Sequence, residues 1–172
     1  LKALRAATLA NLAHHLETFE RNAAAAGAHV HWARDAAEAC QIVTSLAESH
    51  GVRLAVKSKS MTSEEIHLNQ ALARAGVEPV ETDLGEWIVQ LAGETPSHII
   101  APAIHKTRGQ VAALLTPLAG RPLPDDIPTL TAEARRLLRE KFLAAGLGIS
   151  GANLAVAETG SLLIVTNEGN GR

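Results

Sequence analysis

Residues that could do chemistry gather near one end of this sequence, where two apolar runs enclose a short polar break. The runs 154–157 and 162–165 are rich in Leu, Val and Ile and have the length of strands. The break between them holds Glu158, Thr159 and Gly160. We predict a hairpin with Glu158 at its tip as a candidate catalytic carboxylate, and Thr159 and Gly160 as candidate ligand-binding residues. The alternative is a plain structural hairpin, because turns that contain glycine are common.

A second polar cluster follows the hairpin directly. Asn167, Glu168, Gly169 and Asn170 form a loop rich in glycine and asparagine, so its backbone can turn sharply and approach a ligand closely. These four residues are therefore candidate ligand-binding residues. The alternative is a frayed end with no binding role.

A basic, hydroxyl-rich loop follows the first convincing buried strand, which is predicted over 52–56. The loop holds Lys57, Ser58, Lys59 and Ser60, and a helix is expected to begin just beyond it. Ligands of open α/β sheets bind at the carboxyl ends of strands, and a helix start offers N–H groups and partial positive charge. The loop therefore predicts a site for phosphate or a small carboxylate. The alternative is a solvated loop with two surface lysines.

Other polar side chains are expected at the same edge of the sheet. Glu81 and Asp83 follow a strand predicted over 77–81, and His105 follows a strand predicted over 98–103. Glu81 is a candidate catalytic base or partner of a substrate hydroxyl, and His105 is a candidate ligand-binding residue. Asp83 is alternatively a helix cap, and a single histidine is more often a structural hydrogen-bonding group.

The length, composition and net charge of the chain limit the classes of function that it can have. The 172 residues suggest one domain, and the net charge of −2 gives no general attraction for nucleic acid or an anionic membrane. No apolar run is long enough to span a bilayer, so we expect no membrane span and a cytoplasmic location. The single cysteine, Cys40, excludes an internal disulfide and cannot alone hold an iron–sulfur cluster or zinc. We expect no metal and no cofactor in this chain.

Apolar periodicity and turn residues predict alternating helices and strands. One of the helices, over 63–75, is expected to start with a capping box of Thr62 and Glu65. The alternation indicates an α/β domain with a mostly parallel central sheet flanked by helices and a strand hairpin after it. The predicted helices are 1–26, 36–50, 63–75, 84–92, 107–118 and 130–145, and the predicted strands are 29–32, 52–56, 77–81 and 98–103 beside the hairpin.

Three segments together resemble the lactate-utilisation (LUD) domain family. They are KSKSMTSEEIHLNQAL at 57–72, ETDLGEWIVQLAGETPSHIIAPAIHK at 81–106, and GANLAVAETGSLLIVTNEGNGR at 151–172. The resemblance covers nearly the whole chain. It implies the fold shared by ribose-5-phosphate isomerase, glucosamine-6-phosphate deaminase and the CoA-transferases. It also implies a role in a bacterial complex that oxidises L-lactate to pyruvate, with other lactate-utilisation subunits as partners.

The chain departs from the members it resembles most, which carry a ferredoxin-like part with clustered cysteines for 4Fe–4S centres after this domain. The resemblance therefore implies that residues 1–172 are one LUD-type domain, with a helix over 1–26 and an α/β core over 29–172, truncated from a longer parent protein. Electron transfer through 4Fe–4S clusters would belong to that parent. We expect the fragment alone to be inactive as an enzyme, and an unfinished sheet edge would favour a homo-oligomer.

A second hypothesis is a stand-alone enzyme of this fold that acts on a phosphorylated, CoA-linked or folate ligand. CoA-transferases use a glutamate near a glycine-containing turn as nucleophile, and Glu158 beside Gly160 is similar in kind. A third hypothesis is a purely structural assembly module.

Overall fold

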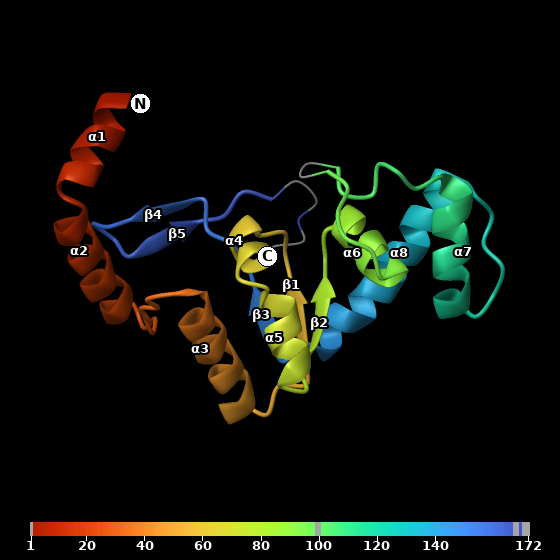
Figure 1. Cartoon of the computed structure of the whole chain (residues 1–172), viewed down its shortest axis with the longest axis horizontal. Helices are drawn as coiled ribbons and strands as arrows, with labels where there is room; N and C mark the ends of the chain where they lie inside the picture. Colours follow the sequence, from red (N-terminus) through yellow and green to blue (C-terminus); the bar gives the residue numbers. More distant parts are fainter. Residues whose placement is uncertain (1, 99–100, 167–168, 170–172) are drawn as a thin grey trace.

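A three-stranded parallel sheet forms the centre of the computed structural model, which describes residues 2–98, 101–166 and 169 (Figure 1). Strand β1 (Leu54–Lys57) lies between β2 (Glu78–Glu81) and β3 (Leu147–Ile149), so the strand order is β2-β1-β3. The α/β class with a mostly parallel sheet is therefore confirmed. β3 was not predicted, because a strand of three residues with a central glycine has little β-propensity.

The remaining elements surround this sheet or extend beyond it. In chain order they are α1 (Lys2–Ala10), α2 (Leu12–Ala25), α3 (Ala36–Ser49), α4 (Met61–Glu65), α5 (Leu68–Arg74), α6 (Leu84–Ala92), α7 (Arg108–Ala119), α8 (Ile127–Ala144), β4 (Leu154–Val156) and β5 (Ser161–Leu163).

Alternate residues of β1 face the two apolar layers that cover the sheet. Val56 packs with Trp87 of α6 and with α7 and α8, whereas Ala55 packs with Leu68 and Leu72 of α5 and with α3. Successive side chains of a strand point to opposite faces, so one strand contributes to both layers. Figure 1 shows α6, α7 and α8 to one side of the sheet and α3 and α5 to the other.

The predicted hairpin is confirmed, but it forms a sheet of its own. β4 and β5 pair in antiparallel fashion, with Val156 opposite Ser161, and every residue of both strands is exposed. The hairpin lies beside α2 rather than beside the parallel sheet (Figure 1). The side chain of Asn22 on α2 donates to the carbonyl oxygens of Ala157 at 2.8 Å and Glu158 at 3.0 Å.

Two predicted strands are wrong. Residues 29–32 are irregular backbone, with Trp32 exposed, and no described strand lies beside them to accept their hydrogen bonds. The described part of 98–103 consists of turns, in which Ser97 and Ile104 donate backbone hydrogen bonds to Pro102 and Ala101. Pro102 also disfavours a strand at this position, because it has no N–H to donate to a neighbouring strand.

Two predicted helices are interrupted. The helix over 1–26 is divided between α1 and α2 at Asn11. The helix over 63–75 is divided between α4 and α5 by His67, whose φ of 56° is left-handed. The N-cap of α4 is Ser60, which accepts from the Ser63 amide, so the predicted Thr62–Glu65 capping box is also wrong. Among the described residues, no helix is both long and apolar enough to cross a bilayer.

Candidate functional site

A buried ion pair joins the carboxyl ends of the two strands β1 and β2. Lys57 and Glu81 are the last residues of these strands and lie directly opposite each other in the parallel register. Their side chains point to the same face of the sheet, and Lys57 Nζ lies 2.9 Å from Glu81 Oε1. The two side chains are only 1% and 4% exposed. A buried charge requires a partner, so the pair accounts for how Lys57 and Glu81 are tolerated inside the domain.

Neighbouring polar groups complete most of the hydrogen bonds of this pair. Lys57 Nζ donates to Ser63 Oγ at 3.0 Å, and Asn69 Nδ2 donates to Glu81 Oε1 at 2.7 Å. The backbone amide of Glu81 donates to the side chain of Gln90 at 3.0 Å. The ion pair therefore connects the sheet to α4 and α5, and the Glu81 backbone connects it to α6.

A second ion pair lies at the same edge. Lys59 Nζ lies 3.1 Å from Glu86 Oε1, and the Glu86 side chain is almost fully buried although it belongs to the first turn of α6. Asp83 caps that helix by accepting from the Glu86 amide at 3.2 Å. The predicted role of Asp83 as a helix cap is thus confirmed.

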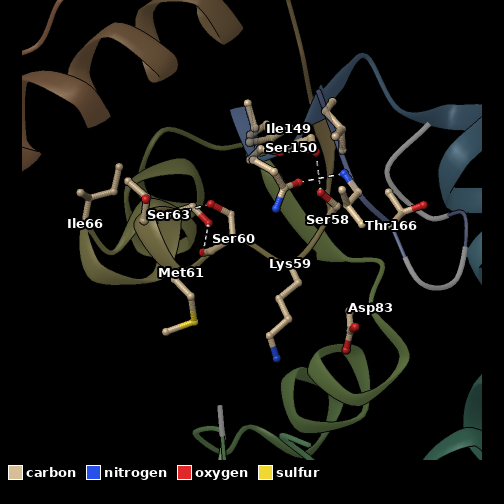
Figure 2. Close-up of a pocket in the computed structure, with 16 residues that line it drawn as sticks. Ser58, Lys59, Ser60, Met61, Ser63, Ile66, Asp83, Ile149, Ser150 and Thr166 are labelled. Carbon is tan, nitrogen blue, oxygen red and sulfur yellow. Dashed lines mark hydrogen bonds between the residues drawn. The ribbon is translucent and has the colours of Figure 1, made fainter. Parts of the chain in front are cut away.

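An open pocket of about 590 Å³, which we call the serine pocket, lies above this edge of the sheet (Figure 2). Its walls come from the loop after β1, the loop after β3 and the segment after β5. In Figure 2 the Lys59 side chain extends between Met61 and Asp83. The lining residues are Ser58, Lys59, Ser60, Met61, Thr62, Ser63, Ile66, Asp83, Ile149, Ser150, Gly151, Ala152, Asn153, Ile164, Val165 and Thr166.

The serine pocket brings together three of the predicted anion-binding residues, Ser58, Lys59 and Ser60. Lys57 is adjacent in sequence but does not line it, because its side chain is directed into the buried pair with Glu81. Ser58 Oγ donates to Ser150 Oγ at 2.9 Å, a contact between the loops after β1 and β3. Sequence reasoning missed Ser150 because it missed β3, the strand that places it there.

A second pocket, of about 520 Å³, lies beside the outer strand β2 at the same edge, and we call it the acidic pocket. Of its lining residues the sequence had indicated Glu81, but Glu64, Asn69 and Glu86 were missed because they fall on helices as ordinary polar positions. Ser63 is shared by both pockets. The lining residues are Ser63, Glu64, His67, Asn69, Gln70, Ala73, Glu81, Glu86, Val89, Gln90, Glu94, Thr95 and Pro96.

The pKa of the Glu64 carboxyl is raised by its surroundings in the acidic pocket. Burial raises the pKa of Glu64 above the ordinary glutamate value, and the nearby carboxylates of Glu86 and Glu81 raise it further. The ammonium groups of Lys57 and Lys59 oppose the change. A carboxyl with a raised pKa among other ionisable groups is typical of a functional site.

His105 lies in a separate cluster, at the end of the turn over 102–105. Its Nδ1 is 2.7 Å from Ser97 Oγ, and its Nε2 is 2.7 Å from Glu94 Oε2. Lys106 also pairs with Glu94, and these contacts lower the pKa of Glu94, with the Lys106 hydrogen bond the largest cause. His105 lines neither pocket, although its partner Glu94 lines the acidic pocket.

The hairpin places its candidate residues away from both pockets. Glu158, Thr159 and Gly160 form the turn between β4 and β5, beside α2, and line neither the serine pocket nor the acidic pocket. A Cβ on Gly160 would lie 2.3 Å from the backbone nitrogen of Ala23. The turn is therefore in tight contact with α2, and the structure does not bring Glu158 to Glu81.

The loop after the hairpin is described at one position. Gly169 is partly buried and has a left-handed φ of 69°. The other candidates there, Asn167, Glu168 and Asn170, lie outside the described residues.

The donors in the described chain do not suit a metal or an iron–sulfur cluster. No group of three or more His, Cys, Asp or Glu side chains in residues 2–98, 101–166 and 169 is arranged to hold a metal ion. Cys40 is a partly buried free thiol that lies 3.2 Å from the carbonyl oxygen of Ile66. Since a 4Fe–4S cluster requires several thiolates, these residues do not fit one.

Comparisons with known proteins give one consistent result. The family model described as the LUD domain matches residues 16–172. Lactate utilization protein B of Bacillus thuringiensis (strain Al Hakam) is 44% identical to this chain over 167 residues, as is the protein of the same name from Bacillus cereus (strain B4264). Each match covers 97% of this chain but only 35% of the relative. No solved structure matches the chain significantly.

Proposed function

This chain belongs to the LUD domain family, and from that premise we propose that it serves lactate utilisation as the domain that binds a small anion in the serine pocket. The observation that carries the role is the 44% identity to proteins named Lactate utilization protein B over 97% of the chain. Because the chain spans 35% of those relatives, the activity of a whole parent protein is part of the proposal.

The process we propose for the parent complex is the oxidation of L-lactate to pyruvate. This step removes two electrons and two protons from the CH–OH group and breaks no carbon–carbon bond. The electrons would pass to 4Fe–4S clusters held by the parent protein and then to partner subunits of the lactate-utilisation system. The described residues do not fit such a cluster, so we assign no electron-transfer step to them.

The contribution of this chain would be to bind and orient the anion. Lys59 contributes an ammonium group to the lining of the serine pocket, and Ser58, Ser60 and Ser150 contribute hydroxyl groups (Figure 2). A carboxylate or phosphate could accept from these groups, since charge-assisted hydrogen bonds are among the stronger ones. The 3.1 Å contact between Lys59 and Glu86 holds the ammonium at the edge of the pocket. The volume of about 590 Å³ lies within the usual range for small-molecule sites.

A titration of this chain tests whether the pocket binds such anions. We expect L-lactate, pyruvate or phosphate at millimolar concentration to shift the backbone amide resonances of Ser58, Ser60 and Gly151. Lys59→Met should weaken binding by about tenfold, the value of one charge-assisted contact. Lys141→Met is the matched control, because Lys141 pairs with Glu78 on the exposed surface and lines neither pocket. Unmoved amides, or equal weakening by both variants, would reject the anion site.

A chimaera tests the physiological role separately. Residues 16–172 would replace the matching region of a Bacillus Lactate utilization protein B, in a strain that lacks its own copy. We expect growth on L-lactate to be restored, and Lys59→Met to slow it more than Lys141→Met does. The proposed role would be contradicted by a well-expressed chimaera whose strain grows normally on other carbon sources but does not grow on L-lactate.

A further inference from the structure

The acidic pocket contains oxygen atoms that accept no hydrogen bond from the described part of the chain. Glu81 Oε2, Asn69 Oδ1 and Glu64 Oε1 are all buried and without a partner there. Glu81 is 4% exposed, and all three residues line the acidic pocket. Buried acceptors without partners are rare in folded proteins, because each loses its hydrogen bonds to water without replacement. Three of them around one pocket require an explanation.

The nearby donors make their hydrogen bonds with other oxygens. Lys57 Nζ donates to Ser63 and to the other oxygen of Glu81, and Asn69 Nδ2 donates to that same Glu81 oxygen. Gln90 Nε2 donates to the carbonyl oxygen of Pro79. Three buried oxygens at this pocket are therefore left without a donor from the described residues, and a complementary ligand would bring donors of its own.

The charges around the acidic pocket also favour a ligand with N–H donors and positive charge. Three carboxylates, those of Glu64, Glu81 and Glu86, lie near two ammonium groups, those of Lys57 and Lys59. With all five groups ionised, this cluster carries one excess negative charge. A ligand with one positive charge would neutralise it.

We propose that the acidic pocket binds an organic nitrogen cation, an ammonium or guanidinium group, whose N–H donors meet the carboxylates of Glu64 and Glu81 and the side-chain oxygen of Asn69. The site adjoins the serine pocket, with which it shares Ser63, and the proposal does not rest on the proposed function. A metal ion is the poorer match, because no metal-holding arrangement of three or more His, Cys, Asp or Glu occurs in the described residues. The cation belongs either to a small amine or to an arginine or lysine side chain of a partner protein.

The raised pKa of Glu64 fits this occupancy. Burial and the carboxylates of Glu86 and Glu81 favour its protonated form, and a bound cation would favour its ionised form. Binding should therefore release a proton and strengthen as pH rises through the pKa of Glu64. The other titratable groups that face or line this pocket are Lys57, Lys59, His67, Glu81, Glu86 and Glu94, the last of which pairs with Lys106 and His105.

The test compares cations that differ in their hydrogen-bond donors. Methylammonium and methylguanidinium chloride are titrated into this chain, with tetramethylammonium chloride as a probe of equal charge that has no N–H group. We expect the first two to give saturable shifts at the amides of Glu64 and Asn69, and tetramethylammonium to give none. Equal effects of all three salts, or no saturable shift with any of them, would overturn the proposal. So would tighter binding of Mg²⁺ at the same amides.

Two variants on the same helix locate the effect. Glu64→Gln should weaken methylguanidinium binding by about tenfold through the loss of one charge-assisted hydrogen bond. Glu65→Gln, on the exposed neighbouring position of α4, should leave binding unchanged. Equal affinity in the Glu64 variant and the unmodified chain would contradict the assignment.

Calorimetry of the unmodified chain in buffers of different ionisation enthalpy measures proton release without any substitution. Release of a proton on methylguanidinium binding supports the site, and its absence near the pKa of Glu64 rejects it.

An N-acetyl-arginine amide probe distinguishes the sources. Tighter binding than methylguanidinium indicates a partner's arginine, and weaker binding indicates a small amine.

Discussion

The parallel sheet and the β4–β5 hairpin are both short-stranded, yet they are stabilised in different ways. In the sheet, Ala55 is fully buried, and Lys57 and Glu81 are buried together. In the hairpin, all residues of both strands are exposed, and Leu154 and Leu162 are each more than half exposed. A two-stranded hairpin alone is marginally stable in water. The hairpin depends on its turn, where Asn22 and Gly160 hold it against α2, whereas the sheet depends on burial from both faces.

The largest expected effect comes from removing one charge of the buried pair. Lys57→Met should lower the free energy of unfolding by about 3–5 kcal/mol, because it leaves the Glu81 carboxylate buried without its counter-ion. Urea unfolding measures the loss. The exposed pair of Lys141 and Glu78 is the control, and Lys141→Met should cost at most about 1 kcal/mol.

A double variant sharpens this comparison. Lys57→Met combined with Glu81→Leu should recover much of the loss, because a buried ion pair is often replaceable by apolar side chains. If Lys57→Met and Lys141→Met cost the same, burial of the Lys57–Glu81 pair does not decide its contribution to stability.

An intermediate effect is expected at the turn of the hairpin. Gly160→Ala forces a Cβ to within 2.3 Å of the Ala23 backbone and adds the strain of a left-handed φ of 69°. We expect a cost on the order of 1–3 kcal/mol. Hydrogen exchange should show faster exchange at the Asn153 amide, which bonds Leu163 across the hairpin, and little change at the Thr82 amide beside the sheet.

Gly120→Ala is the control for this substitution. Gly120 has a similar φ of 67°, but nothing lies within 4 Å of its added Cβ. It should therefore cost only the backbone strain. Equal effects of the two variants would show that the hairpin turn is not packed tightly against α2.

The smallest expected effect is a pH dependence at Glu94, on the exposed surface. Its pKa is lowered in the folded chain, first by the hydrogen bond from Lys106 and then by His105. The folded state therefore binds fewer protons than the unfolded state, so Glu94 stabilises the fold above the ordinary glutamate pKa of 4.5. That contribution is lost as pH falls through the lowered pKa.

The measurement compares thermal unfolding of Glu94→Gln and the unmodified chain at several pH values. We expect the variant to be slightly less stable at pH 7 and the difference to close in acid. A difference that persists unchanged well below pH 4.5 would show that the Glu94 side chain acts through packing rather than charge.

The sequence was informative where a single local rule decided the outcome. The helix over 84–92 was predicted with the observed bounds, because Asp83 caps it and Gly93 ends it. The loop after β1 was correctly placed between a strand and a helix, so Ser58, Lys59 and Ser60 were assembled in one pocket.

The sequence was uninformative where partners far apart in the chain decided the outcome. β3 exists because Leu147 and Ile149 lie beside β1, about ninety residues earlier. The acidic pocket depends on residues of α4, α5 and α6 meeting beside the end of β2, which no periodicity within one helix reveals. His67 divides a predicted helix through its left-handed backbone, a conformation that is uncommon for residues other than glycine.

The position of Lys57 opposite Glu81 also bears on how the strands find their alignment during folding. If β2 slipped by one residue, Val80 or Thr82 would stand opposite Lys57, and the Glu81 carboxylate would turn to the other face of the sheet, among the side chains around Val56 and Trp87. The Lys57 ammonium and the Glu81 carboxylate would then be buried on opposite faces of the sheet, each without its partner. The penalty for that arrangement is far larger than the difference between two apolar registers, so this single pair selects one alignment of β1 and β2 among otherwise similar alternatives.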